Sequence, residues 1–349
     1  MKRFAFLLAL ILCLAAGTSY AWENKLAWSF KPEMRTSGGM SIENNLMFIG
    51  DRSGKLYAID INSGKVKWDF RDEEATSIVG TPAVVEKKFV VIAQSGAKVI
   101  CLNIADGSEV WEYTSKAAGA MGENMTDGVA YGKGKIFFSK DSGKLTALNF
   151  KDGELLWEYQ SKNADLRTAP LYSDNYIFLG EQGGLFSMIN PDTGERVSGG
   201  GAGGPVRTPA VSGGNVYYTS WNGSVYAVKI AGTTPLWEIK TGASITTSPV
   251  IHDGKIFVGT SDGTVIALKQ DNGETLWKFN TENGSIVFPP VAGDKIIFVA
   301  SGQGNIFALD PETGKVKETV KLSEGADSFA YNNGILYYAT RDGNICAVK

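Results

Sequence analysis

The sequence has few of the residues that commonly act in catalysis or bind transition metals. Its 349 residues include three cysteines and one histidine, His252. A single histidine excludes a multi-histidine metal site, and its place in a short His-Asp-Gly turn argues against a histidine-based catalytic triad. Carboxylate chemistry of the glycosidase kind stays open, because it needs only two of the 37 acidic side chains at a suitable separation.

Basic residues are in deficit as well. The chain carries 34 lysines and arginines against 37 acidic residues, for a net charge of −3 at pH 7. Nucleic-acid-binding proteins usually present an excess of positive charge to the phosphate backbone. The charge balance therefore disfavours nucleic acid as a partner.

Long hydrophobic runs are confined to the N-terminus. Lys2 and Arg3 precede an apolar run over residues 4–16, and Ser19-Tyr-Ala21 has small residues at the cleavage positions, as in a secretory signal peptide. No later stretch reaches the roughly 18 to 20 apolar residues that span a bilayer. We expect residues 1–21 to be removed, leaving an exported protein, periplasmic or extracellular, without a transmembrane segment. Cys13 follows Leu-Ile-Leu, which is bulky where a lipoprotein signal has a small residue, so we expect no lipid anchor there.

Tryptophan and turn residues repeat along the chain about every 40 residues. Six of the eight tryptophans follow this period, once at double spacing: Trp28, Trp68, Trp111, Trp157, Trp237 and Trp277. A turn position recurs eight times with the same period, at Gly54, Ala97, Gly143, Gly183, Gly223, Gly263, Gly304 and Gly343. A period of this length indicates a repeat architecture.

Each repeat contains four short apolar stretches separated by tight turns. In residues 248–279 the turns are His-Asp-Gly, Ser-Asp-Gly and Asp-Asn-Gly. Asp-Gly and Asn-Gly supply the positive φ angles of two-residue hairpins, so each repeat is predicted to be a four-stranded antiparallel sheet. Such a sheet is one blade of a propeller.

The two ends of the chain complete one blade between them. Residues 344–349 have the pattern of a third strand, and residues 25–30 that of a fourth. We therefore predict an all-β, eight-bladed propeller over residues 22–349, with the ring closed by the N-terminal strand in the last blade. Closure removes the free edges through which sheets associate, and we expect a monomer.

The repeat Tyr57-Ala-Ile-Asp-x-x-Ser-Gly-x-x-x-Trp68 resembles the pyrroloquinoline-quinone (PQQ)-type propeller repeat family over essentially the whole mature chain. The six periodic tryptophans are then structural residues of the blades. A position in each third strand is uniformly small, and we predict that it makes room for the indole of a neighbouring blade: Ala58, Cys101, Ala147, Ser187, Ala227, Ala267, Ala308 and Ala347.

The name of this family raises the question of a quinone cofactor. Quinoprotein dehydrogenases with this repeat have longer chains, Ca²⁺ ligands and a disulfide between adjacent cysteines. This sequence has no Cys-Cys pair, and its loops lack a concentrated acidic cluster. We therefore expect no cofactor, no metal and no enzymatic activity, with Cys101 and Cys346 buried and unpaired.

The face that carries the turns between second and third strands is the expected working surface. The position two before the turn residue is basic in the first and eighth blades, where Arg52 and Arg341 should lie together with Arg35. Asp141 and Glu181 occupy this position across the ring, so we predict a face that is basic on one side and acidic on the other. Trp221 is the exception: either it contacts a partner or it folds onto its own loop.

The segment before the fourth blade, Ala164-Asp-Leu-Arg-Thr-Ala-Pro170, resembles the Leu-Arg loop with which an outer-membrane assembly lipoprotein of this family contacts its membrane-protein partner. The resemblance implies that Leu166 and Arg167 are contact residues. The alternative is an ordinary blade-to-blade connection, because Val-Arg-Thr-Pro209 shows that Arg-Thr is partly a feature of the repeat.

Two classes of function follow. The first is a non-catalytic exported scaffold that binds an envelope or exported protein partner through its loop face, as in outer-membrane protein assembly. The second is binding of a small molecule or polysaccharide, with or without catalysis, in the central funnel.

Overall fold

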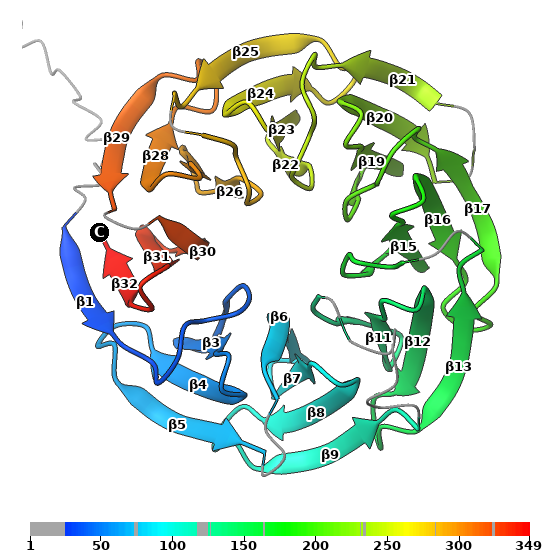
Figure 1. Ribbon diagram of the computed structural model, residues 1–349, viewed down its shortest axis with the longest axis vertical. Helices are drawn as coiled ribbons and strands as arrows, with labels where there is room; N and C mark the ends of the chain where they lie inside the picture. The colour runs from blue at the N-terminus through cyan, green and yellow to red at the C-terminus, as the bar shows by residue number, and fades with distance from the viewer. Residues whose placement is uncertain are drawn as a thin grey trace, which may run out of the picture.

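The computed structural model is a ring of eight four-stranded sheets around a central axis (Figure 1). It describes residues 25–72, 76–116, 125, 127–162, 165–230, 232, 235–282, 284–322 and 325–349. Every helix or strand assigned in these ranges is a β-strand, and the predicted eight-bladed all-β propeller is confirmed. The predicted signal peptide, with Cys13, lies outside the described residues.

Within each blade the first strand lies nearest the axis and the fourth outermost (Figure 1). Blades 1 and 2 contain β2 (Ser41–Glu43), β3 (Leu46–Gly50), β4 (Lys55–Asp60), β5 (Val66–Arg71), β6 (Ile78–Val85), β7 (Phe89–Gln94), β8 (Lys98–Asn103) and β9 (Glu109–Thr114). Blades 3 and 4 contain β10 (Ala130–Gly132), β11 (Lys135–Ser139), β12 (Lys144–Asn149), β13 (Leu155–Gln160), β14 (Leu171–Ser173), β15 (Tyr176–Gly180), β16 (Leu185–Ile189) and β17 (Arg196–Gly201).

The second half of the ring has the same order. Blades 5 and 6 contain β18 (Ala210–Ser212), β19 (Asn215–Thr219), β20 (Ser224–Lys229), β21 (Pro235–Lys240), β22 (Val250–His252), β23 (Lys255–Gly259), β24 (Thr264–Lys269) and β25 (Thr275–Asn280). Blades 7 and 8 contain β26 (Val291–Ala292), β27 (Ile297–Ala300), β28 (Asn305–Leu309), β29 (Val316–Lys321), β30 (Ala326–Asn332), β31 (Ile335–Thr340), β32 (Ile345–Val348) and β1 (Leu26–Phe30).

The ring closes in blade 8 as predicted. Strand β1 pairs antiparallel with β32, and Trp28 lies opposite Ala347. The backbones of Lys25 and Lys349 exchange two hydrogen bonds of 3.1 and 3.0 Å. The last blade therefore combines strands from both ends of the chain.

The core lies between adjacent blades. Second and third strands are buried along almost their whole length, because other blades cover both of their faces. This explains why they appear in the sequence as continuous apolar runs. Outer strands such as β13 and β21 stay partly exposed.

Each of the six periodic tryptophans ties its blade to the following one. Its indole N–H donates a hydrogen bond of 2.7 to 3.3 Å to a backbone carbonyl in the next blade. The ring lies against a glycine with positive φ in the turn between that blade's third and fourth strands, where a Cβ would come within 2.5 to 2.8 Å of the indole: Gly64, Gly107, Gly153, Gly194, Gly273 and Gly314. The tryptophans thus contact the next blade, as expected of structural residues, and their docking site is this glycine. The small residue of the third strand pairs instead with the tryptophan of its own blade, as Ala58 does with Trp68.

The two blades without a tryptophan precede the two blades without this glycine contact. In blade 7 the tryptophan position of the fourth strand holds Glu318. In the following blade, blade 8, the third and fourth strands come from opposite chain ends, so no turn joins them. In blade 4 the tryptophan position of the fourth strand holds Ser198. In the following blade, blade 5, Gly232 lies in the turn between the third and fourth strands and touches no indole. The Phe186, Tyr218 and Tyr226 rings stack at this junction instead, with centroids 4.8 Å apart at each step.

In blade 4 the register of the third strand differs from the prediction by one residue. The turn glycine is Gly184, with φ of +81°, rather than Gly183. The residue that pairs with the outer Ser198 is accordingly Met188, not Ser187. A large residue on the third strand thus faces a small one on the fourth, the reverse of the Ala–Trp pairs.

The two cysteines in the described residues behave as predicted. Cys101 and Cys346 are both buried and free. Burial raises the pKa of the Cys101 thiol to about 12 and also raises that of Cys346. Both serve as small apolar residues of the core.

Candidate functional site

The segments that cross from each outer strand to the next inner strand converge on one face around the axis (Figure 1). We call this the loop face; it also carries the turns between second and third strands. Within the described residues, an isolated bridge joins the segment to the end of a second strand in five crossings, for example Val206 to Ser220 and Ile245 to Thr260. The crossings are therefore fixed to the blades and hold their side chains in defined positions.

Leu166 occupies the buried position of its crossing. Its side chain is completely inaccessible and packs in a core cluster with Phe137, Leu179 and Ile189. The equivalent residues in other crossings, such as Val206 and Ile245, are equally buried. The Leu166 side chain is therefore not placed for the direct partner contact that the resemblance implied, because this position anchors the crossing to the core.

Arg167, the next residue, lies on the surface of the loop face. About 60% of its side chain is exposed, and its guanidinium pairs with Asp165 at 2.8 Å. It borders a cavity of about 190 Å³ that is also lined by Arg207, Thr208 and Thr246. Of the predicted Leu-Arg pair, only the arginine is available to another molecule.

Trp221 is partly exposed, and its ring packs against the side chain of Arg207. Some 45% of its surface is accessible, although the Arg207 guanidinium lies 5.2 Å from the centre of its ring. Burial lowers the pKa of Arg207, while the charge of Asp127 acts in the opposite direction. The indole thus packs on its neighbouring crossing and still presents a large apolar surface to solvent.

The predicted group of arginines between blades 8 and 1 is present. Arg35 forms a bidentate ion pair with Asp327, and Arg341 approaches the same carboxylate at 4.0 Å. The backbone N–H of Arg52 donates to the carbonyl of Arg35 at 3.0 Å. Asp327 is not among the predicted site residues, although its place just after the buried Ala326 matches that of Arg167 after Leu166.

The predicted acidic half of the loop face is wrong for Glu181. This carboxylate is completely buried, where it accepts hydrogen bonds from the hydroxyls of Ser161 and Ser187. The error follows from the shift in blade 4, because Gln182 is the residue two before the true turn glycine. Asp141 is half-buried, so the acidic side of the face is weaker than the sequence suggested.

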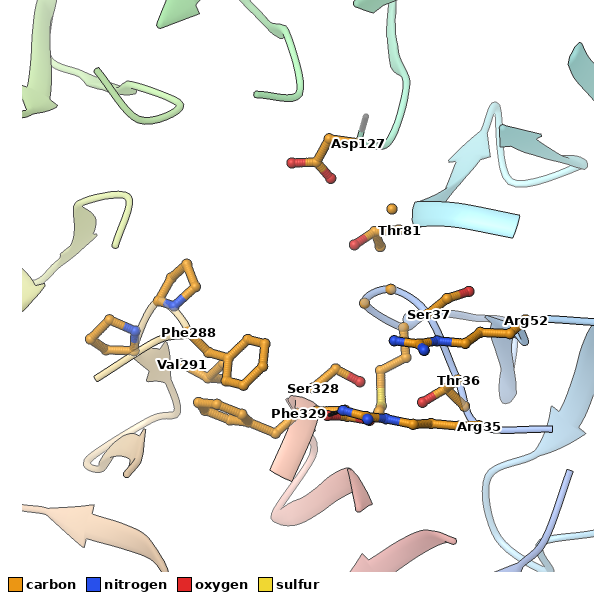
Figure 2. Close-up of a pocket in the computed structure, with 17 residues that line it drawn as sticks. Arg35, Thr36, Ser37, Arg52, Thr81, Asp127, Phe288, Val291, Ser328 and Phe329 are labelled. Atoms are coloured by element: carbon orange, nitrogen blue, oxygen red, sulfur yellow. Dashed lines mark hydrogen bonds and ion pairs between the residues drawn. The ribbon is translucent and has the colours of Figure 1, made fainter. Parts of the chain in front are cut away.

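A cavity of about 610 Å³ lies at the mouth of the central funnel on the loop face (Figure 2). Residues from blades 1, 2, 3, 7 and 8 line it, among them Arg35, Arg52, Asp127, Phe288 and Phe329. This volume lies in the usual range for ligand pockets, about 300 to 1,000 Å³. The funnel mouth is therefore large enough to enclose part of another molecule.

Asp127 lies between the two cavities and lines both. Burial raises the pKa of its carboxyl group, against the opposing effects of the Gly128 and Ala169 backbone N–H groups and of Arg207. Sequence reasoning did not single out Asp127, because it becomes distinctive only where the crossings meet.

In the ranges given above, no three His, Cys, Asp or Glu residues are grouped so that they could hold a metal ion. No helix in those same ranges is long and apolar enough to cross a bilayer.

Comparison with known families identifies a match along nearly the whole chain. The family model described as outer membrane protein assembly factor BamB matches residues 15–196, 182–287 and 265–349. The BamB protein of Yersinia pestis is 22% identical over 253 residues, which cover 66% of this chain and 63% of that protein. The BamB protein of Salmonella typhimurium is 28% identical over 258 residues, covering 67% and 64%. The matched segments thus span slightly less than two thirds of these relatives.

Solved structures share the fold. The crystal structure of BamB from Moraxella catarrhalis superimposes with a TM-score of 0.79 at 19% identity, over 93% of this chain and 98% of that one. The computationally designed Ika8 protein superimposes equally well, with a TM-score of 0.80 at 17% identity, over 91% and 97%. Because a designed ring is as similar as a natural protein, this likeness concerns the architecture alone.

Proposed function

Because this chain belongs to the outer membrane protein assembly factor BamB family of PQQ-like propellers, we propose that it is a non-catalytic scaffold in outer-membrane protein assembly. It acts in the periplasm after export and binds a protein partner through its loop face. The observation that carries the proposal is the exposed aromatic and cationic surface of blades 4 and 5, where Trp221 and Arg167 reach solvent.

These two residue types suit a protein contact. Tryptophan and arginine are enriched among the residues that dominate the energy of protein interfaces. Arg207 lies over the Trp221 ring, and the backbone N–H of Trp221 donates to the carbonyl of Pro205 at 3.0 Å. Because the indole is supported before binding, less conformational entropy is lost when a partner covers it.

Leu166 contributes indirectly. Its burial fixes the crossing that carries Arg167, so the dipeptide combines a structural anchor with an exposed cation. We propose that Arg167, together with Trp221, contacts the partner, with Arg35, Arg52 and Arg341 forming a second basic area of the same face.

The proposal is tested by complementation in the organism of origin. Deleting the gene should lower the amount of folded outer-membrane proteins, and the wild-type gene should restore it. A double variant, Arg167→Glu with Trp221→Ala, should fail to restore this amount although the protein accumulates normally, because a reversed charge and a lost aromatic surface both weaken the contact.

The matched control is Lys151→Glu, a charge reversal in an exposed turn between β12 and β13 on the opposite face. This variant should restore folded outer-membrane proteins like the wild type. Full complementation by the double variant, or equal failure of Lys151→Glu at normal protein levels, would contradict the assignment of the loop face.

A further inference from the structure

The cavity at the funnel mouth combines charge with an apolar wall. Arg35 and Arg52 extend into it from blade 1, and Phe288 and Phe329 lie across from them on blades 7 and 8 (Figure 2). Met40 and two consecutive prolines, Pro289 and Pro290, complete the apolar part of the lining. The cavity is therefore suited to a group that is apolar on one side and charged on the other.

Positive charge on the blade 1 side is incompletely neutralised. Arg35 and Arg341 share one carboxylate, Asp327, and Arg52 has no ion pair with any residue in the described ranges. Arg35 and Arg52 line the cavity together with the carboxylates of Asp327 and Asp127, and Arg52 is the lining arginine that forms no ion pair within the described residues. Asp127 lines the far side of the cavity, where Arg207 stands beside it.

The same wall has unused hydrogen-bonding groups. The hydroxyls of Thr36 and Ser328 line the cavity, are at least nine-tenths buried and have no partner within the described part of the chain. Buried polar groups normally have a partner, and leaving one unsatisfied costs free energy. Because both hydroxyl oxygens are closed to solvent, a bound acceptor at this wall would first meet the guanidinium groups of Arg35 and Arg52.

We propose that this cavity binds an acidic side chain of the partner protein, an aspartate or glutamate flanked by apolar residues, between the arginines and the phenylalanines. The inference rests on the proposed function and names the chemistry of the partner segment. A peptide is the occupant that fits, because the cavity opens on the face assigned to the partner and its lining combines guanidinium groups with apolar side chains, which match an acidic residue flanked by apolar ones. The chain as a whole carries a net charge of −3, so Arg52 would select an acidic segment locally rather than by general attraction.

Short peptides test the cavity without the partner. The probes are N-acetylated, C-amidated Phe-Glu-Phe and Phe-Gln-Phe, with binding to the purified protein followed by ligand-observed NMR. We expect the acidic peptide to bind about tenfold more tightly than the amide, because only the carboxylate forms charge-assisted hydrogen bonds with arginine. Arg52→Gln should remove most of this difference, while the control Lys151→Gln, on the opposite face, should keep it.

Several outcomes would overturn the proposal. These are equal binding of the two peptides, an unchanged preference in Arg52→Gln, or no binding of either peptide at about 10 mM, a concentration well above the roughly 1 mM Kd of a weak complex. Benzoate serves as a free small carboxylate. Should it bind as tightly as the acidic peptide and depend equally on Arg52, the occupant is a small molecule and the peptide assignment fails.

Failure of the cavity is distinguishable from failure of the proposed function. If the peptides show no preference but the Arg167→Glu and Trp221→Ala double variant still fails to complement, the function stands and only the cavity assignment falls. If peptide binding depends on Arg52 but Arg52→Gln complements fully, the cavity does not serve the partner and the inference is likewise overturned.

Discussion

Replacing Trp277 with alanine should lower the free energy of unfolding by about 3 to 5 kcal/mol, the usual cost of truncating a buried tryptophan. Its indole is 9% exposed, donates to the Pro311 carbonyl at 3.0 Å and lies against Gly314 of the next blade. The change removes a contact between blades 6 and 7 and leaves a cavity there. Urea unfolding of the wild type and the variant, followed by circular dichroism, measures the loss.

Trp221→Ala is the matched control, because it removes the same side chain from the surface. This indole is 45% exposed and makes no blade-to-blade contact of the kind described for Trp277. We expect a change within about 0.5 kcal/mol, as for most surface substitutions. Equal destabilisation by the two variants would refute the division into structural and functional tryptophans.

Leu166→Ala should destabilise the protein by about 2 to 5 kcal/mol, the range for truncating a fully buried leucine. The side chain packs with Phe137, Ile177 and Leu179 at the junction of blades 3 and 4. The crossing that carries Arg167 should loosen as a consequence. Urea unfolding measures the first effect, and faster amide hydrogen exchange at residues 165–168 measures the second.

Arg167→Ala, one residue further on, should change stability by no more than about 0.5 kcal/mol, since its side chain is 60% exposed. The adjacent residues thus separate folding from binding. A Leu166→Ala variant as stable as the wild type would show that the leucine is not a structural anchor, and would restore it as a candidate contact residue.

The architecture was predictable because the repeat makes each local signal recur. Turn glycines, apolar strands and tryptophans agree with one another in most blades, and the two strands at the chain ends determined how the ring closes. Blade 4 was misaligned by one residue because Gly183 and Gly184 are adjacent and either could be the turn glycine. The same shift placed Glu181 on the surface although it is buried.

The site was less predictable, because it forms where segments distant in sequence converge. Alignment of the crossings would have identified Leu166 as buried, since Ile78, Val206, Ile245 and Ile286 form an apolar series at its position. The resemblance of a short Leu-Arg segment to a contact loop concealed that series. Asp327 and Asp127 could be identified only from the structure, because nothing in their local sequence indicates that Arg35, Arg341 and Arg207 lie beside them.

Site-specific photocrosslinking in living cells tests most directly whether the loop face binds the partner. A photoreactive amino acid would replace Trp221, Arg167 or, on the opposite face, Lys151, and the crosslinked proteins would be identified by mass spectrometry. We predict that positions 221 and 167 crosslink to a component of the outer-membrane protein assembly machinery, and that position 151 does not. Crosslinking to that component from position 151 but from neither loop-face position would contradict the account.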